Sequence, residues 1–394
     1  MDIVEHKQKL YALVDDMRDM LIEINDFIHD NPETGNNEVK AYKLITEVLA
    51  GHGFAVDKEV IGLATAFRAT YKIGEGGPKI GLLCEYDALE GLGHGCGHNL
   101  QAPAIIGAAL ALAQELGDSP AEIIVFGTPA EETTSGKLPM TKAGIFDDLD
   151  VALMMHASDR TTVDGKSLAV NLVDFIFEGK AAHAAIAPER GISALDAVLM
   201  TFNGIEYLRE HMRSDVRIHG IITDGGIAAN IVPERAAAQF YIRANDRPHL
   251  DTVVERVYNV AKGMAMAVGA RLTINEVKAY DNKMNVETLN QILLAEVAAA
   301  GAKDITPPRT FTGSTDFSCV TYRVPGACLR VSFVPFDTPS HSQEWVEAAK
   351  SQAAYEAVVV TAKAIAGACY DLVKKPELLQ RIKQEFVAAK QASK

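Results

Sequence analysis

Apolar stretches that end in polar residues constrain the fold most strongly. "KIGLLCEYD", "AEIIVFGTPAEE" and "DVALMMHAS" each have the length of a buried strand, and each ends in acidic residues or beside a histidine. Between the first two, "LQAPAIIGAALALAQEL" has the length of a buried helix. Strands that alternate with helices predict an α/β fold with a mostly parallel sheet. Functional residues of such sheets gather beyond the carboxyl ends of the strands, so we expect a site there.

The pattern changes near Ser167 and returns near Asn282. In between, "SLAVNLVDFIFEG" alternates like a half-buried strand, and two long amphipathic helices and two further strands follow it. This predicts an inserted α+β domain with an antiparallel sheet over residues 167–281. The first and second parts of the interrupted domain are then residues 1–166 and 282–394. Outside the insert we also expect helices over residues 5–29 and 39–52, and a closing helix from Glu347.

Composition excludes several classes of protein. The chain has 394 residues and a formal net charge of -14, which argues against nucleic acid as a partner because phosphate binding needs clustered Lys and Arg. No run of about 18 apolar residues is present, so no membrane span is expected. The first residues, "MDIVEHKQKLYALVDDM", lack the features of a signal peptide. The five scattered cysteines favour reduced thiols, so we expect a cytoplasmic protein.

Polar residues at the predicted strand ends form a candidate metal site. In the stretch "CEYDALEGLGHGCGHN", one glycine separates Cys96 from His98, which lets both side chains face one point. Thiolate, imidazole and carboxylate ligands together suit zinc or another divalent transition metal. Each residue alone is more often a loop or surface group, but together they predict a metal site. The candidates are Cys96, His98, Glu131, Glu132, His156 and, from "TPSHSQEW", His341.

These motifs resemble those of a known family. "GHGCGHN", "GTPAEE" and "SHSQEW" are similar to the metal and catalytic motifs of the M20 metallopeptidases, in the amidohydrolase (M20D-like) branch. "NPETGNNEVKA" and "GSTDFSCVTYRVPG" resemble the aminoacylase-1-like-2 and aminobenzoyl-glutamate hydrolase type. The resemblance implies a catalytic domain with a dinuclear metal site, interrupted by a dimerisation lid. It implies two divalent ions per chain, zinc or manganese, with cobalt as a further candidate.

The resemblance also implies roles for the residues of the metal site. Cys96 would be a ligand shared by the two ions, with His98 on one of them. Glu132 would be a ligand and Glu131 the general base. The remaining expected ligands are His156 and His341, and Asp87 is expected to orient a ligand. The chain departs from the family at Glu90, at Gly95 and in "TTSGK" after the paired glutamates, which bears on substrate preference and leaves every expected ligand in place.

The predicted lid carries further candidates. His183, in "GKAAHAAIAPERG", resembles a lid histidine that reaches the active site of the partner subunit and stabilises the oxyanion. This implies a homodimer formed through the lid. Asn230 and Arg243 are expected to hold a substrate carboxylate, for which Arg offers a bidentate fork. A third group, expected to contact substrate, comprises Thr312, Gly313 and Ser314.

The favoured hypothesis is a hydrolase that cleaves an amide bond next to a free carboxylate by metal-activated water. Expected substrates are N-acyl amino acids, small dipeptides or aminobenzoyl-glutamate-like conjugates. One alternative is an aminohydrolase that releases ammonia from a small amide or amine, which product analysis would distinguish. Another is a non-catalytic binding subunit, against which the presence of Glu131 and every expected ligand argues.

Overall fold

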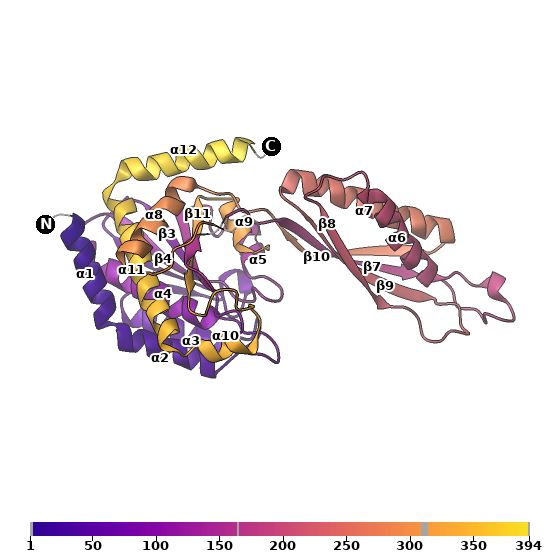
Figure 1. Cartoon of the computed structure of the whole chain (residues 1–394), viewed down its shortest axis with the longest axis horizontal. Coiled ribbons are helices and arrows are strands. Elements are labelled where there is room, and N and C mark those ends of the chain that lie inside the picture. The colour runs from indigo at the N-terminus through magenta and orange to yellow at the C-terminus, as the bar shows by residue number, and fades with distance from the viewer. Residues whose placement is uncertain (1–2, 164, 309–313, 393–394) are drawn as a thin grey trace. The chain divides into compact units, whose positions relative to one another are not determined.

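The computed structural model describes residues 3–163, 165–308 and 314–392 (Figure 1). It divides the chain into two compact units. Unit 1 combines the residues up to Lys166 with Lys283–Ala392, and unit 2 comprises Ser167–Asn282. Each unit has its own sheet and its own hydrophobic core.

Unit 1 is built on a seven-stranded sheet in the order β1-β2-β4-β3-β5-β11-β6. The four strands β4, β3, β5 and β11 run parallel in the centre, and antiparallel strands complete both edges. Because the central strands are buried on both faces, their sequences are continuous apolar runs. This arrangement confirms the predicted α/β class. The strands are β1 (Ala55–Lys58), β2 (Phe67–Ile73), β3 (Lys79–Cys84), β4 (Ala121–Gly127), β5 (Val151–Ser158), β6 (Thr162–Val163) and β11 (Gly326–Ser332).

Helices cover the sheet of unit 1, and α4 and α11 are the most deeply buried of them. Gly107 of α4 permits close packing, since a Cβ there would meet Leu21 at 2.8 Å and Ala362 at 3.1 Å. The helices are α1 (Ile3–Asp16), α2 (Arg18–Asp30), α3 (Val39–Gly51), α4 (Gln101–Glu115), α5 (Lys137–Lys142), α8 (Glu287–Ala299), α9 (Phe317–Thr321), α10 (Gln343–Ala348), α11 (Gln352–Lys374) and α12 (Pro376–Ala392), with short 3-10 turns at η1 (Val60–Gly62) and η2 (His98–Leu100).

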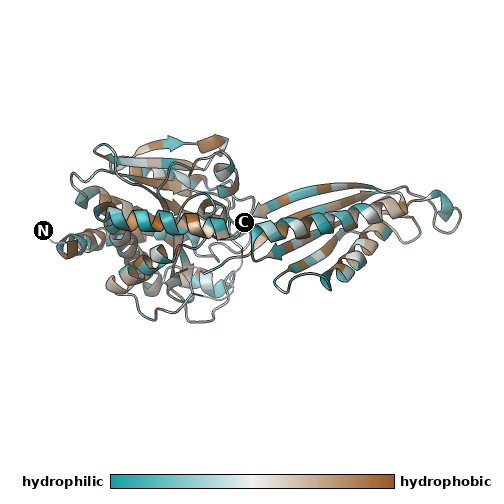
Figure 2. Ribbon diagram, turned by 90° about the horizontal axis from the view of Figure 1, so that it is seen from above, coloured by the Kyte–Doolittle hydropathy of each residue, from teal (hydrophilic) through white to brown (hydrophobic). Residues whose placement is uncertain are grey.

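Two predicted helices differ from the structure. The helix expected over residues 5–29 is interrupted at Met17, although backbone hydrogen bonds continue across the break from Met17 N–H to Leu13 O and from Leu21 N–H to Met17 O. The closing helix expected from Glu347 is wrong, because α10, α11 and α12 are separate. Ser351 caps the start of α11, and Pro376 at the start of α12 cannot continue the preceding helix. Figure 2 shows hydrophobic and hydrophilic residues alternating along α12, whose buried residues are Ile382 and Phe386.

Unit 2 is an antiparallel four-stranded sheet in the order β10-β7-β9-β8, with two helices packed on it. Its elements are β7 (Ala169–Glu178), α6 (Ala194–Arg209), β8 (Arg217–Asp224), β9 (Arg235–Ala244), α7 (Arg247–Val268) and β10 (Arg271–Tyr280), with a short 3-10 turn, η3 (Pro188–Arg190). The sequence did not predict β8. This edge strand leaves most of its side chains exposed, Ile221 and Ile222 included, so it lacks the alternation of a half-buried strand.

None of the helices in the described ranges is long and apolar enough to cross a membrane.

Candidate metal centre

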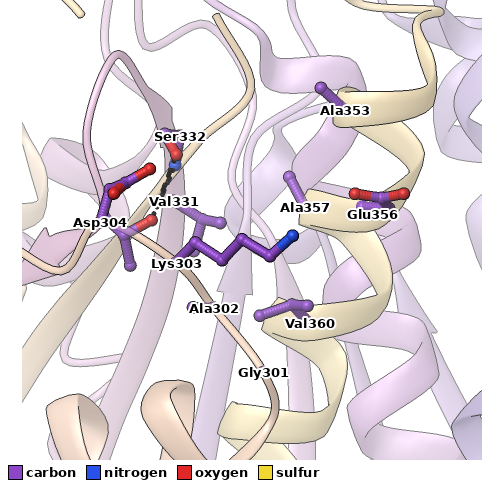
Figure 3. A pocket seen from close by; sticks show the side chains of 11 residues that line it. Gly301, Ala302, Lys303, Asp304, Val331, Ser332, Ala353, Glu356, Ala357 and Val360 are labelled. Atoms are coloured by element: carbon purple, nitrogen blue, oxygen red, sulfur yellow. Dashed lines mark hydrogen bonds between the residues drawn. The ribbon is translucent and has the colours of Figure 1, made fainter.

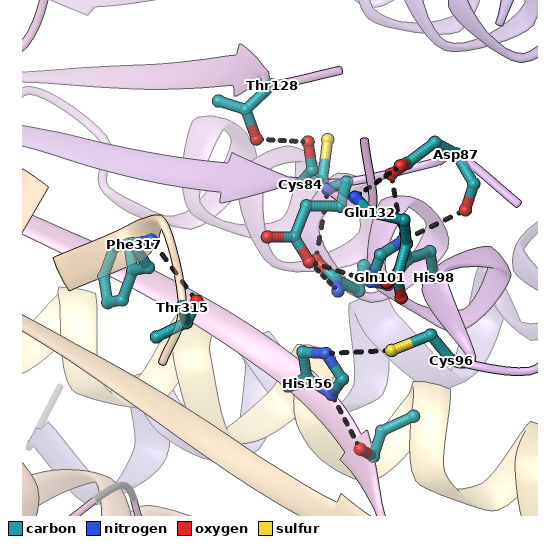
Figure 4. Close-up of polar contacts among 12 residues, drawn as sticks. Cys84, Asp87, Cys96, His98, Gln101, Thr128, Glu132, His156, Thr315 and Phe317 are labelled. Atoms are coloured by element: carbon teal, nitrogen blue, oxygen red, sulfur yellow. Dashed lines mark hydrogen bonds and ion pairs between the residues drawn. The ribbon is translucent and has the colours of Figure 1, made fainter. Parts of the chain in front are cut away.

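The sheet of unit 1 brings the predicted polar residues together at the carboxyl ends of its parallel strands. Glu85 directly follows β3, and a loop then leads to Cys96 and to His98 at the start of η2. Glu131 and Glu132 lie just beyond β4, and His156 lies near the end of β5. Figure 4 shows Cys96, His98, Glu132 and His156 gathered around one region of this edge.

Two groups of potential ligands share the Cys96 thiol. Its Sγ atom groups with nitrogens of His98 and His156, and separately with ligand atoms of Glu132 and His341. Within each group, the ligand atoms lie within 4.8 Å of one another. The Cys96 Sγ atom is 3.7 Å from His156 Nε2, and Glu132 Oε1 is 3.4 Å from His341 Nε2. The arrangement therefore offers two adjacent three-residue sites with one common ligand.

Local backbone conformation makes this convergence possible. Gly97 has φ 74°, and a Cβ atom there would meet the Ala157 side chain at 2.6 Å, so the turn between Cys96 and His98 favours glycine. His341 also adopts a positive φ, 60°, and its N–H donates to Gly95 O at 2.9 Å. This hydrogen bond ties the late loop of the chain to the loop that carries Cys96.

Asp87 connects two of the candidate ligands. Its backbone oxygen and its Oδ1 each lie 3.0 Å from His98 Nδ1, so Nδ1 is the protonated nitrogen and donates to Asp87. Its Oδ2 accepts from the backbone N–H of Glu132 at 3.0 Å. His98 Nε2 therefore faces away from Asp87, and its lone pair becomes available as a ligand when this nitrogen is deprotonated.

The residues at this edge fit a transition-metal site. Within the described chain, His98 Nε2 and Glu132 Oε1 are buried and make no hydrogen bond; each has only an ion-pair contact, with Glu85 Oε2 at 3.2 Å and with His341 Nε2 at 3.4 Å. A metal ion would satisfy both atoms. Burial raises the pKa of the Cys96 thiol to about 12, so this group needs a nearby positive charge to bind as a thiolate. Burial also lowers the pKa of His156 to about 4, which keeps its imidazole neutral. A soft thiolate, imidazoles and a carboxylate together match the ligand preferences of zinc.

The adjacent glutamates have opposite electrostatic environments. Burial, together with the nearby Asp316 and Glu85, raises the pKa of Glu131 well above its usual value. Burial also acts to raise the pKa of Glu132, but the contact with His341 and the charge of His98 outweigh it and lower the value to about 2. Two carboxyl groups whose environments drive their pKa values apart suit two different roles.

A turn near the start of the chain supports the loop that carries these glutamates. Glu38 is buried, and its Oε1 accepts from the N–H of Ala130 at 2.8 Å. Ala130 has φ 62°, a strained value for a residue with a side chain. A Cβ at Gly35 would lie 2.1 Å from Thr133 Oγ1, so the turn and the loop pack without a gap. The segment "TTSGK", which departs from the family pattern, thus packs against the turn "NPETGNNE".

Sequence reasoning missed a buried charged cluster beside Glu131. Lys137 Nζ donates to Glu85 Oε1 at 2.5 Å and to Asp316 Oδ1 at 2.9 Å. The sequence signal for it was the lysine in "TTSGKLPM"; in the fold, Lys137 is the first residue of α5 and is buried. Nothing in the local pattern indicated that its partners would come from residues 52 positions earlier and 179 positions later.

Three predicted residues lie in unit 2, at two different ends of its sheet. His183 pairs with Ile231 in an isolated bridge, and Ala184 N–H donates to Asn230 O at 3.0 Å, so His183 and Asn230 are neighbours. Arg243 pairs with Val170 near the other end of β9, where its guanidinium lies 5.1 Å from the centre of the Tyr241 ring. The structure of one chain therefore does not bring Arg243 and Asn230 together.

The predicted substrate loop is described only in part. Thr312 and Gly313 lie outside the described residues. Ser314 is described, and its hydroxyl oxygen is buried without a hydrogen-bond partner among the described residues. Close to it, Thr315 Oγ1 accepts from Phe317 N–H at 3.3 Å, as Figure 4 shows.

A separate pocket of about 190 Å³ opens between α11 and the end of β11 (Figure 3). Lys303, Asp304 and Glu356 supply its charged groups, and Val331 and Val360 supply apolar surface. It contains none of the residues predicted for the metal site.

Comparisons with known proteins agree with the motifs. Residues 79–366 match the model of Peptidase family M20/M25/M40. The chain is 34% identical to an Xaa-Arg dipeptidase of Mus musculus, over 96% of this chain and 92% of that protein. It is 29% identical to a p-aminobenzoyl-glutamate hydrolase subunit of Escherichia coli (strain K12), over 96% of this chain and 95% of that protein. A dinuclear metal binding peptidase of Bacillus subtilis superposes with a TM-score of 0.69 at 20% identity, over 91% and 99%, which shows a shared fold.

Proposed function

The chain belongs to peptidase family M20/M25/M40, a family of hydrolases of amide and peptide bonds, and we propose that it cleaves a small substrate next to a free carboxylate. The observation that carries the proposal is the Cys96 thiol shared by two three-residue ligand groups, with Glu131 directly beside one of their members. Such a constellation suits metal-assisted hydrolysis.

We assign the two ions to the groups that share Cys96. His98 and His156 would hold one ion with it, and Glu132 and His341 would hold the other. Zinc is the first candidate because a thiolate is among the ligands, and manganese and cobalt are the others. Bound divalent ions would polarise the amide carbonyl and lower the pKa of bound water, so that hydroxide is available as the nucleophile at neutral pH.

The remaining steps fall to residues of the chain. Glu131, free of the two ligand groups that share Cys96, would accept the proton of the attacking water and return it to the leaving amine. Asp87 would keep His98 in the tautomer that leaves Nε2 available, and would fix the backbone of Glu132. The strained turn at Ala130, held by Glu38, would set the orientation of Glu131 in the loop after β4.

Unit 2 would supply the groups that bind the substrate carboxylate and the oxyanion, and its geometry favours a homodimer. Eight strand positions separate Arg235 from Arg243 on β9, about 26 Å at a rise of roughly 3.3 Å per residue. His183 and Asn230 lie beyond the Arg235 end. One carboxylate cannot reach both ends, so Arg243 and the pair His183 and Asn230 can act on one substrate only if they come from different chains.

The surface of unit 2 is consistent with such a dimer. Unit 2 supplies eleven of the eighteen large hydrophobic side chains that are exposed in the described parts of the chain. They include Ile221 and Ile222 on the edge strand β8, and Leu199 and Tyr207 on α6. An exposed, hydrophobic edge strand is a ready surface for pairing with another chain. We propose that a second copy of this chain covers it.

The relatives indicate which substrates to test. Their names specify an Xaa-Arg dipeptide and p-aminobenzoyl-glutamate, which both present an amide beside a carboxylate. We propose small dipeptides, N-acyl amino acids and aminobenzoyl-glutamate-like conjugates as substrates. We also propose a cytoplasmic location, because all five cysteines are free.

The test is a screen of these substrates with protein loaded with zinc, manganese or cobalt, followed by amine release. We expect an amino acid product, and loss of activity on chelation that added metal restores. Release of ammonia instead would favour an aminohydrolase. A metal-loaded chain that binds these compounds and turns over none of them would favour a binding subunit.

A further inference from the structure

Lys137 is a fully buried cation at the edge of the proposed active site. Its side chain is 0% exposed, and its ammonium donates to Glu85 and to Asp316. A lysine is almost never buried completely unless it is paired. Oxygens of Glu85, Glu131 and Asp316 lie within 4.8 Å of one another, so the ammonium bonds two members of a close set of three carboxyl groups.

Further hydrogen bonds extend this cluster in two directions. On one side, Asp316 Oδ2 accepts from Ser135 Oγ at 2.7 Å. On the other side, Glu85 Oε2 accepts from Gln101 Nε2 at 2.6 Å and lies 3.2 Å from His98 Nε2. The cluster thus joins the end of β3, the loop after β4 and the start of α9, which are far apart in the sequence.

We propose that Lys137 is a positioning residue for Glu131, an inference that rests on the proposed function of Glu131 as proton shuttle. Like charges repel strongly where water is excluded, so three carboxyl groups this close need a cation to hold them together. The Lys137 ammonium binds Glu85 and Asp316 and thereby keeps Glu131 beside His98 and Glu132. It acts through these carboxylates and does not touch the reacting atoms.

The first test replaces the charge and keeps the volume. Lys137→Met should lower kcat by about 10- to 100-fold, the scale of losing a group that supports a metal ligand, with little change in KM and an unchanged metal content. Lys7→Met is the matched control, because Lys7 also pairs with two carboxylates, Glu296 and Asp371, but lies on α1 away from the strand ends. The kcat of Lys7→Met should equal that of the wild type. Lys137→Gln serves if the methionine variant does not fold.

The second test removes one negative charge in compensation. If Lys137 acts by charge, Lys137→Met/Asp316→Asn should recover part of the lost kcat, because fewer carboxylates then repel one another. The asparagine can still accept the hydrogen bond from Ser135. The effect of Asp316→Asn on the unfolding temperature should reverse sign with the background. The substitution should lower the unfolding temperature in the wild type and raise it in Lys137→Met.

These outcomes separate the inference from the proposed function. A wild-type kcat in Lys137→Met overturns the inference, and so does a double variant that is no better than the single one. A wild-type chain that hydrolyses none of the substrates would refute the proposed function. The unfolding temperatures then still decide whether the cluster is a charge clamp, and an absence of the sign reversal would overturn it.

Discussion

Unit 1 and unit 2 hold their candidate functional residues in opposite ways. Unit 1 collects Cys96, Glu132, His156 and others from distant segments onto one sheet edge, where buried Asp87 holds His98 and Glu132 by hydrogen bonds. Unit 2 places His183 and Arg243 at opposite ends of an open sheet with an exposed edge strand. The proposed metal centre is thus complete within one chain, whereas the proposed substrate-binding groups of unit 2 would act on one substrate only across a dimer.

The largest expected effect concerns the two glutamates of unit 1. Glu131→Gln should lower kcat by about 100- to 10,000-fold, the range for loss of a general base, and leave the metal content unchanged. Glu132→Gln should lower the metal content as well, because Glu132 belongs to a ligand group with Cys96 and His341. Kinetics and metal analysis on the same preparations check both. Metal loss in the first variant and not in the second would mean that the two roles are exchanged.

The next prediction tests whether unit 2 acts across a dimer. His183→Ala should lower kcat by roughly 100-fold, as expected for loss of an oxyanion donor. When His183→Ala and Glu131→Gln chains are mixed, half of the dimers are mixed at random exchange, and each has one intact composite site of two. Activity should therefore recover to about a quarter of the wild-type value if the sites are independent.

The control for this experiment is subunit exchange itself, followed with differently tagged chains. Mixing two batches of Glu131→Gln should give no recovery. If exchange is complete and the mixed sample stays inactive, His183 acts in its own chain or outside catalysis. The contrast between a self-sufficient unit 1 and a partner-dependent unit 2 would then be wrong.

A smaller effect is expected from metal removal at unit 1. Cys96 is the one cysteine that is not fully buried, so it is the thiol that a reagent reaches first. A bound metal should protect it, and chelation should increase its rate of alkylation, since a coordinated thiolate is unavailable as a nucleophile. Peptide mass mapping would identify the labelled residue, with buried Cys84 as the internal control. Equal labelling with and without metal would remove Cys96 from the ligand set.

The sequence predicted the elements whose pattern is local. Apolar runs identified β3, β4 and β5, and the polar residues that follow or end them, together with His341 from a late loop, were the candidates for the metal site. The edge strand β8 escaped because only Ile218 of its apolar residues is buried while Ile221 and Ile222 are exposed, which leaves no alternation. Lys137 escaped because its importance depends on Glu85 and Asp316, which only the folded chain brings to it. The distance along β9 between Arg243 and the Asn230 region likewise follows from strand pairing rather than from any motif.

The smallest expected effects compare one glycine from each unit. Gly35→Ala should destabilise the chain by about 1–3 kcal/mol, the usual cost of overpacking, because the new Cβ would meet Thr133 and Ala130 in the loop that carries Glu131. Gly263→Ala, in the middle of α7 with nothing within 4 Å of the new Cβ, should stabilise unit 2 by roughly 0.5–1 kcal/mol through helix propensity. Urea unfolding measures the change in stability of each variant, and steady-state kinetics measures the change in kcat. We expect kcat to fall in Gly35→Ala and to stay at the wild-type value in Gly263→Ala. If Gly35→Ala kept both its stability and its kcat, the turn at residues 33–38 would not be the support of the Glu131 loop, and unit 1 would be less tightly fixed than its contacts indicate.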